Sequence, residues 1–526
     1  MHIIFLFVCI LFFLTPSLAL KDKLQIAFMP SPGNFQVIPS FVKLAEFLSL
    51  FKGYGCVAVV HGADKNVWDR TPCLKTKYGI DRGESYMEKF LTAQNTFEDK
   101  YFWNAEPFHE LFETLINDFS NSKVLFDLKK LDIDVLVCDV SNFLCNFVAQ
   151  KLEIPKKVYH SPTLPSYYLT GHLESSASYH PVMTSPYTNL MSLRERFMNY
   201  LRHYILSHGI KSQRKLFAEL LKEKTDEKLY LDKFFDPISL VTTQSARGFN
   251  YPLYLPPNVA QLGCISCIMP HQVPLSLDNF LSKYKTNIFI KIDRIKTSDI
   301  LKNVIDSMSE FNKFGFVIKA DLPKGLKLPT NLHKIDYVPT ADILASNKII
   351  IFIHDGDWNS IIEGIYYQVP MIALSYEYDR RANGVFVQDR KIGVSLGNEI
   401  DVTKGNLFRS IRKIIDSKAK YMESIEKYSR IVNGMNTTKQ IEKWFQDYIN
   451  NGIEHLVVKP YYEMPFYSYY NLDVWFVIFV LPLFLTCGFF FYCSKLVKKR
   501  IGKLKGRQKR DKVFPKEKEI QKEKTE

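Results

Sequence analysis

Several features that would place a chain in a special class are scarce or missing in this sequence of 526 residues. Only nine residues are cysteine, and the pair Cys264 and Cys267 has no second CxxC partner, so a zinc or redox site has weak support and a structural role is expected. No internal repeat or low-complexity run precedes the basic C-terminal tail, which excludes solenoids and largely disordered proteins. The hydrophobic fraction of 46% is ordinary for globular domains.

Net positive charge is small outside the C-terminal tail, although the whole chain carries +14. Residues 495–526 hold fourteen Lys or Arg against five Asp or Glu, a surplus of nine, which leaves only +5 for the rest of the chain. That surplus is small for a nucleic-acid binder of this length. The sequence therefore predicts no nucleic-acid partner.

Two segments lack charge altogether, and they lie near opposite ends of the chain. Residues 3–14 are a short apolar run followed by the small residues Ser17 and Ala19, which predicts a signal peptide over 1–19. Residues 474–494 are long enough to cross a bilayer as a helix, and Lys and Arg follow at once, as is typical of a cytoplasmic flank. The pattern predicts a single-pass type I membrane protein with a lumenal body.

Two short motifs agree with residence in the endoplasmic reticulum. Lys522 and Lys524 occupy the fifth and third places from the C-terminus, which resembles a dilysine retrieval signal, although chance is an alternative in so lysine-rich a tail. Asn436-Thr-Thr438 is an N-glycosylation sequon on the predicted lumenal side.

Between its ends the chain shows two α/β patterns. Apolar strands at 24–29 and 56–60 flank residues with helical spacing, and a similar unit recurs around 133–159. Helical hairpins are expected around 187–235. The proline-rich segment 251–257 then breaks the periodicity, as is typical of a domain linker.

Further strands are predicted after the linker at 287–292, 314–319 and 348–353. The predicted domains are 20–260 and 261–455, followed by a juxtamembrane segment over 456–473, a transmembrane helix over 474–494 and a basic cytosolic tail over 495–526. Two doubly wound sheets of this kind would share a cleft, and such sheets bind nucleotides beyond the carboxyl ends of their strands.

The most informative stretch runs from Ile349 to Gly384. An apolar strand ends at His354, a polar turn with Gly356 follows, and a helix begins near Asn359 and Ser360. The first turn of a helix offers free N–H groups and a partial positive charge, which suit a diphosphate. One turn further on, Glu363 is placed to accept hydrogen bonds from ribose hydroxyls.

This stretch resembles the signature of the UDP-glucuronosyl and UDP-glucosyl transferases. The positions that agree are Asn359, Ser360, Glu363, Val369, Pro370, Asp379 and Asn383, with further likeness at 178–181, 257–259 and 337–344. The resemblance implies an α/β protein of glycosyltransferase B type, with two facing Rossmann-like domains plus one C-terminal transmembrane helix. It also implies a UDP-sugar donor, a small lipophilic acceptor, and neither a cofactor nor a metal.

The resemblance assigns roles to particular residues of this chain. Nucleotide-binding positions are Tyr337, Thr340, Gly356, Asn359, Ser360 and Glu363; sugar-contacting positions are Asp379 and Arg380; the catalytic position is Asp139, at the end of a predicted strand. In active relatives an aspartate at that place orients a histidine general base, which takes the proton of the acceptor hydroxyl.

This chain departs from the family pattern at the position of the general base. Residues 31–40 contain no histidine, and ungapped counting places Val37 at its position. His61, after another predicted strand, is the first alternative base. Whether the chain is an active enzyme is therefore left open.

The donor site departs from the pattern as well. Asp355 and Asp357 stand where the family has a phosphate-binding histidine and a glycine, and two carboxylates repel a diphosphate. Lys291 and Arg294, in the turn after the first strand of the second half, offer partial compensation, and a shifted turn would bring His354 to the phosphate.

Two functions remain open at this point. The first is inverting transfer of a hexosyl or glucuronosyl group from a UDP-sugar to the hydroxyl of a small lipophilic acceptor. The alternative is a catalytically inactive relative that serves as a lumenal binding or regulatory partner of active glycosyltransferases, in homo- or hetero-oligomers.

Overall fold

The computed structural model describes residues 23–32, 37–62, 67–79, 105–163, 177–182, 184–226, 239–253, 255–292, 298–320, 322, 328–335, 338–376, 380–456, 465–469 and 471–513. These fall into two compact units, Met1–Val457 and Val458–Glu526. The predicted signal peptide and dilysine end lie outside the described residues, as do Arg294, Tyr337 and Asp379.

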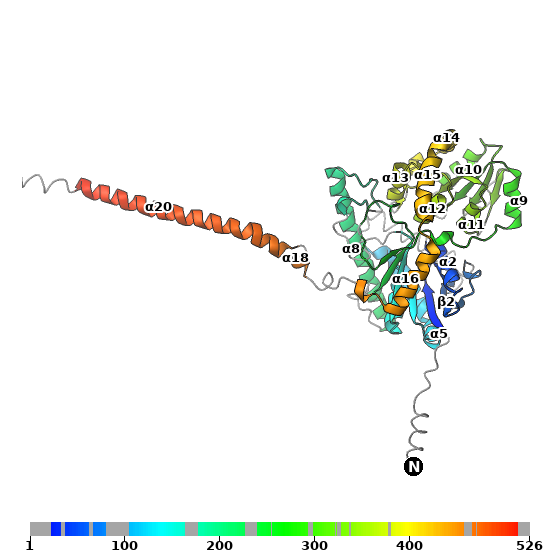
Figure 1. Cartoon of the computed structure of the whole chain (residues 1–526), viewed down its shortest axis with the longest axis horizontal. Coiled ribbons are helices and arrows are strands. Elements are labelled where there is room, and N and C mark those ends of the chain that lie inside the picture. The colour runs from blue at the N-terminus through cyan, green and yellow to red at the C-terminus, as the bar shows by residue number, and fades with distance from the viewer. Residues whose placement is uncertain are drawn as a thin grey trace, which may run out of the picture. The chain divides into compact units, whose positions relative to one another are not determined.

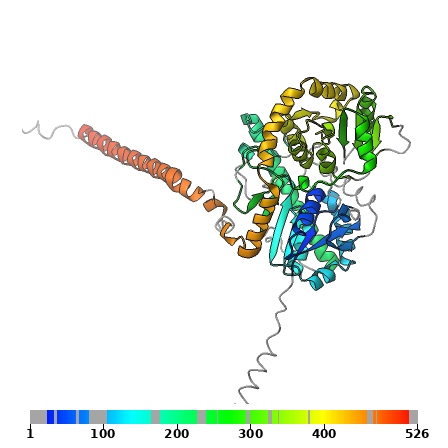
Figure 2. The ribbon, with the colours of Figure 1, turned by 45° about the vertical axis from the view of Figure 1, so that its right-hand side comes forward.

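The first half of the body is built on a parallel seven-stranded sheet with the strand order β3-β2-β1-β4-β5-β6-β7 (Figures 1 and 2). Its strands are β1 (Leu24–Met29), β2 (Tyr54–His61), β3 (Leu74–Tyr78), β4 (Val135–Asp139), β5 (Lys156–Ser161), β6 (Leu240–Thr243) and β7 (Val259–Gln261). Because every pairing is parallel, all the carboxyl ends lie at one edge.

Helices cover both faces of this sheet, because alternate strand residues point to opposite sides. Ile26 and Phe28 pack on one face with α2 (Ile38–Leu48), whereas Ala27 and Met29 pack on the other. The helices of the second face are α4 (His109–Ser120), α5 (Val124–Leu131), α6 (Phe143–Lys151) and α8 (Leu193–Thr225). Where hairpins were expected around 187–235, α8 is one continuous helix of 33 residues that begins with a capping box at Ser192.

The second half is built on a parallel six-stranded sheet with the order β10-β9-β8-β11-β12-β13. Its strands are β8 (Asn287–Lys291), β9 (Gly315–Lys319), β10 (Leu332–Lys334), β11 (Ile349–His354), β12 (Met371–Ala373) and β13 (Gly393–Ser395). Its helices are α9 (Leu275–Lys283), α10 (Ser298–Met308), α11 (Thr340–Ala345), α12 (Trp358–Tyr366), α13 (Arg381–Asp389), α14 (Lys404–Asp416) and α15 (Lys418–Asn433). The predicted pair of α/β sheets is confirmed.

One C-terminal helix returns to the first sheet. α16 (Thr437–Asn451) follows α15, yet Ile441 and Phe445 pack in the same core cluster as β1 and α2. The Tyr448 hydroxyl accepts from the Lys157 N–H at 3.0 Å and lies 3.0 Å from the Lys157 carbonyl oxygen. The contacts of α16 therefore cross the predicted division of the chain into 20–260 and 261–455, which stays a prediction.

The second unit contains an apolar helix. Residues Leu472–Lys509 form a helix that is long and apolar enough to cross a membrane, through α19 (Leu472–Trp475), the π-helical turn η9 (Phe476–Val480) and α20 (Leu481–Val513); the short α18 (Phe466–Tyr469) precedes it. Pro482 lies two residues after the end of the π turn, and a proline removes one helical N–H and crowds the carbonyl four residues earlier. The predicted apolar C-terminal helix is confirmed.

The cysteines of the body are paired. Disulfides join Cys56 to Cys73, Cys138 to Cys145 and Cys264 to Cys267, whereas Cys487 and Cys493 of α20 are free. The CxxC disulfide thus joins Cys264, the N-cap of the short 3-10 helix η5 (Ile265–Cys267), to the last residue of that helix, where the chain passes from the first sheet to the second. Disulfides of this number fit an oxidising compartment.

Candidate nucleotide-sugar site

The turn between β11 and α12 is fixed by a glycine and a capping carboxylate. Gly356 has φ +83°, and a Cβ there would lie 3.1 Å from the Ser375 Cα, so a larger residue is excluded on both grounds. Asp357 is the N-cap of α12, and its Oδ1 accepts the Ser360 backbone N–H at 3.0 Å. The carboxylate of Asp357 therefore already occupies the helix end that was expected to hold a diphosphate.

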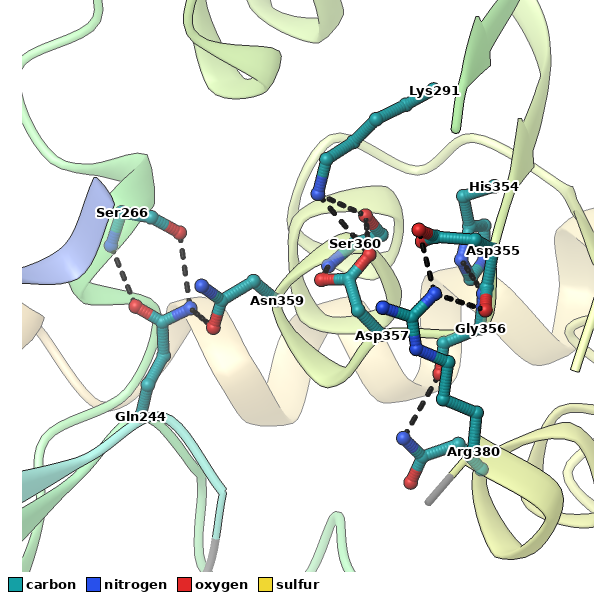
Figure 3. A network of polar contacts seen from close by, with 11 residues as sticks. Gln244, Ser266, Lys291, His354, Asp355, Gly356, Asp357, Asn359, Ser360 and Arg380 are labelled. Carbon is teal, nitrogen blue, oxygen red and sulfur yellow. Dashed lines mark hydrogen bonds and ion pairs between the residues drawn. The ribbon is translucent and has the colours of Figure 1, made fainter. Parts of the chain in front are cut away.

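Lys291 neutralises that carboxylate. The last residue of β8 lies beside His354 of β11, and its Nζ is 3.1 Å from Asp357 Oδ2 and 3.1 Å from the Ser360 hydroxyl (Figure 3). Burial alone would raise the pKa of Asp357, but the nearby cationic groups, Lys291 foremost, outweigh burial and hold it well below its usual range. Lys291 is thus the compensating cation, as the sequence suggested.

Arg380 neutralises the second carboxylate. Its Nη1 lies 2.6 Å from Asp355 Oδ2 and donates to the Asp355 carbonyl oxygen at 2.9 Å, with both side chains only 2% exposed. The guanidinium predicted to contact a sugar therefore points to Asp355 (Figure 3). Since each aspartate has its own buried cation, the expected repulsion of a diphosphate is offset within the protein.

His354 is enclosed beneath this turn. Its Nδ1 accepts the Gly356 N–H at 3.1 Å, and burial lowers the pKa of His354 to about 3, so the ring is neutral. His354, Asp355 and Asp357 are close enough to hold a metal ion. Because Lys291 and Arg380 already balance both carboxylates, the group presents no net negative charge to a cation.

A glutamine of the first half reaches the start of α12. Gln244 follows β6 directly, and its Nε2 donates to Asn359 Oδ1 at 2.9 Å and to the Ser266 hydroxyl at 3.0 Å (Figure 3). Its Oε1 accepts the Ser266 N–H at 2.8 Å, and its carbonyl oxygen accepts the Trp358 indole N–H at 2.9 Å. The network joins the carboxyl edge of the first sheet to the candidate donor site; a glutamine after a strand carries no sequence signal for this role.

Glu363 lies one turn into α12 and is buried at 3% exposure. Burial raises the pKa of Glu363 to about 7, although Lys291 and the Ser266 hydroxyl lower it. Its Oε2 has no hydrogen-bond partner among the residues that the structure describes. Glu363 thus combines a buried carboxyl group with a vacant acceptor.

The structure describes four of the predicted nucleotide-binding residues at one place and a fifth on the neighbouring helix. Gly356, Asn359, Ser360 and Glu363 gather at the start of α12, and Thr340 is the first residue of α11, which packs beside α12. Tyr337 and Asp379 lie outside the described residues, so their placement stays a prediction.

Asp139 ends β4 at the carboxyl edge of the first sheet, where the resemblance places the catalytic aspartate. It accepts hydrogen bonds from the Ser141 N–H at 3.1 Å and the Ser141 hydroxyl at 2.9 Å, and burial raises its pKa despite these bonds. Val37, the expected position of the missing base, is a buried N-cap residue packed in the same core cluster as Phe41. Its side chain faces the core, so restoring a histidine there would bury an imidazole in apolar surroundings.

His61, the alternative base, and His160, which the sequence did not single out, both contact other side chains of the first half. His61 lies 3.6 Å from Asp118, and burial lowers its pKa more strongly than Asp118 raises it. His160, beside Asp139 in register, contacts the Ser40 and Thr242 hydroxyls at 2.8 and 3.0 Å, and burial lowers its pKa to about 3. Burial therefore favours the neutral form of both rings, and both contact other side chains of the first half.

Two parallel doubly wound sheets, joined where the second presents a helix N-terminus at its carboxyl edge, define the glycosyltransferase B fold. Os79 from O. sativa, crystallised in complex with UDP, superimposes with a TM-score of 0.56 at 13% identity, covering 81% of this chain and 100% of its own. The spinosyn forosaminyltransferase SpnP gives a TM-score of 0.54 at 14% identity, covering 81% of this chain and 99% of its own.

The family follows from the sequence comparisons. The family model "UDP-glucoronosyl and UDP-glucosyl transferase" matches residues 80–510, and the chain belongs to this family. UDP-glucuronosyltransferase 3A1 of Homo sapiens is 26% identical over 404 residues, covering 74% of this chain and 75% of its own. UDP-glucuronosyltransferase 1A9 of Mus musculus is 23% identical over 535 residues, covering 96% and 97% of the two chains.

Proposed function

We propose that this chain is a UDP-glycosyltransferase of the endoplasmic reticulum membrane, with a lumenal body and one C-terminal span. It transfers a hexosyl or glucuronosyl group from a UDP-sugar to the hydroxyl of a small lipophilic acceptor. The observation that carries the proposal is the buried carboxyl group of Glu363 on α12. Its Oε2 accepts no hydrogen bond from any residue that the structure describes. A buried acceptor without a donor is costly, and a ribose hydroxyl would satisfy it.

The remaining residues have assigned roles in this proposal. The uracil lies against Tyr337 and Thr340, and the diphosphate reaches the N-terminus of α12 by displacing the Asp357 carboxylate from the Ser360 N–H. Lys291 lies 3.1 Å from the Ser360 hydroxyl and is placed to follow the phosphate charge. We assign the sugar contacts to Asp379 and Arg380, and a contact from Arg380 requires its guanidinium to leave Asp355.

The reaction itself is an in-line displacement. The acceptor oxygen bonds to the anomeric carbon as the bond to UDP breaks, which inverts the configuration at that carbon. The hydroxyl proton must pass to a base. Asp139 stands where relatives have the aspartate that orients a histidine, and because that histidine is replaced by Val37 we propose that the Asp139 carboxylate takes the proton itself, aided by a pKa that burial raises.

A second candidate is a catalytically inactive relative that binds or regulates other glycosyltransferases. Two observations favour it: Asp357 already satisfies the N-terminus of α12, and Val37 packs in the core rather than towards a cleft. A pair with an active family member would then need no chemistry from this chain.

One series of measurements separates the two candidates. The full chain, reconstituted in lipid nanodiscs, is heated with and without UDP, and stabilisation by RT ln(1 + [L]/Kd) reports binding. Radiolabelled UDP-glucose and UDP-glucuronate are then incubated with phenolic and steroid acceptors. Labelled product that is lost in Asp139→Asn supports transfer by this chain, whereas UDP stabilisation without product favours the inactive relative. Absence of both would refute donor binding.

A further inference from the structure

A cavity of about 1240 Å³ shares no lining residue with the candidate nucleotide site. It lies between the segment 246–261, of which the structure describes every residue but 254 and which ends with β7, and α16 with the residues that follow it to Leu456. Pockets for small molecules usually enclose about 300–1,000 Å³. The cavity is therefore large enough for a drug-sized ligand together with water.

The walls of this cavity are rich in apolar and aromatic side chains. Leu253, Leu255 and Val259 line one side, and Trp444 and Tyr448 of α16 line the other. Aromatic walls of this kind favour a flat apolar body, because each buried ring contributes a large contact area.

Three cations from three different segments add a positive charge to these walls. Arg247 and Lys443 are exposed and form no ion pair with any described residue. The Arg390 guanidinium lies 5.0, 5.3 and 5.6 Å from the ring centres of Tyr251, Phe386 and Tyr428, and it too has no acidic partner within the described part of the chain.

The nearby acids do not cancel this charge. Asp389, next to Arg390 in the chain, accepts the Tyr251 hydroxyl at 3.1 Å instead. Asp447 is the one acidic residue among the described lining residues, which leaves a surplus of two positive charges. In addition, Asn250 Oδ1 is buried with no donor among the described groups.

We propose that this cavity is a second ligand site for an amphipathic organic anion. The flat apolar body lies between the 246–261 segment and α16, the acidic head pairs with Arg247, Lys443 and Arg390, and a hydroxyl of the ligand donates to Asn250 Oδ1. An anion partly removed from water gains more from such pairing than an exposed one does.

The probe for this site is 6-hydroxynaphthalene-2-sulfonate, which combines a flat body, an anionic head and a hydroxyl donor. Its binding to the full chain in phosphatidylcholine nanodiscs is followed by fluorescence, with empty discs as the blank. We expect the Kd to be at least tenfold lower than that of neutral 2-naphthol, and about threefold lower than that of naphthalene-2-sulfonate. Saturating UDP should leave binding unchanged, so this result is independent of the proposed donor site.

Charge variants locate the probe. Arg247→Ala combined with Lys443→Ala should raise the Kd at least fivefold, whereas Lys439→Ala, an exposed lysine of the same helix outside the cavity, should leave it unchanged. Arg390→Lys, which keeps the charge and the fold but loses the planar group, should weaken binding about threefold. The proposal is overturned if the anion and 2-naphthol bind equally, if the double variant binds as the wild type does, or if UDP displaces the probe.

Discussion

Lys291 and Arg380 each hold one of two neighbouring aspartates in a buried ion pair at the candidate donor site. Removing one partner of such a pair leaves an uncompensated buried charge, which costs roughly 3–5 kcal/mol. These two ion pairs therefore stabilise the site. They also contain the carboxylate, Asp357, that a phosphate would have to displace from the start of α12.

The variant Asp357→Asn tests this competition at the helix end. Asparagine keeps an oxygen that can cap α12, but Lys291 loses its counter-ion. We expect the ligand-free protein to lose about 3 kcal/mol of stability and UDP to give a larger rise in melting temperature than in the wild type, because phosphate would replace the lost charge. Asp355→Asn is the matched control, since it breaks the Arg380 pair without freeing the Ser360 N–H. An equal UDP response in both variants would contradict displacement of Asp357.

Glu363 makes stability depend on pH. Its pKa is about 7 in the folded protein against an ordinary 4.5. The folded state therefore binds more protons than the unfolded state between these values, and stability falls as pH rises through this window. Above pH 7 the ionised Glu363 lowers the free energy of unfolding by its full amount, on the order of 3 kcal/mol at about 1.4 kcal/mol per pKa unit.

Glu363→Gln should remove that penalty. Chemical denaturation without ligand should show the variant more stable than the wild type at pH 8, with the difference shrinking towards pH 5. The exposed Glu423→Gln on α15 serves as the control and should track the wild type at both pH values. A pH-independent difference for Glu363→Gln would show that Glu363 is not the titrating group.

At the scale of elements, α16 makes the clearest stability prediction. Phe445 is completely buried in the core cluster that it shares with residues of β1 and α2, so Phe445→Ala should cost about 3–5 kcal/mol through lost burial and a residual cavity. Tyr448→Phe should cost only about 1 kcal/mol, the usual net value of a lost hydrogen bond. Gln446→Ala on the same helix should stay within about 0.5 kcal/mol of the wild type. Similar costs for Phe445 and Gln446 would mean that α16 does not close this core.

The local sequence pattern predicted the strands well, but it did not predict which distant segments pack together. The strands expected at 24–29 and 348–353 are observed at Leu24–Met29 and Ile349–His354, because apolar runs bounded by turn residues report directly on buried strands. The spacing of α16 fits a helix, yet nothing in its sequence says that it returns to the first sheet.

The candidate site was predictable only in part for the same reason. The start of α12 follows from strand, glycine and cap in one continuous stretch. Gln244, the Asp355–Arg380 pair and the packing of Val37 depend on residues that the fold brings together from far apart in sequence. A sequon or an apolar span is read locally, whereas an ion pair requires the fold.

At the scale of the whole molecule, glycosylation at Asn436 tests the proposed lumenal topology. Asn436 is exposed and caps α16 through Oδ1, which accepts the Lys439 N–H at 3.3 Å, so Nδ2 is chemically available for a glycan. We expect chain made with microsomes to carry one endoglycosidase H-sensitive glycan.

Thr438→Ala should abolish the glycan and the change in gel mobility that it causes. Thr438→Ser should retain both because the sequon is preserved. Protection of the body from added protease provides an independent measure of topology. A chain that carries no glycan and whose body is digested by the added protease would refute a lumenal location.

The return of α16 to the first sheet also has a consequence for how the protein is made. Until residues 437–453 leave the ribosome, the apolar face that Ile441 and Phe445 cover stays bare on a nascent N-terminal half. The core on that face of the sheet therefore cannot close until most of the message has been translated. A transcript cut short before α16 would yield a chain that chaperones retain, even though every strand of both sheets had been synthesised.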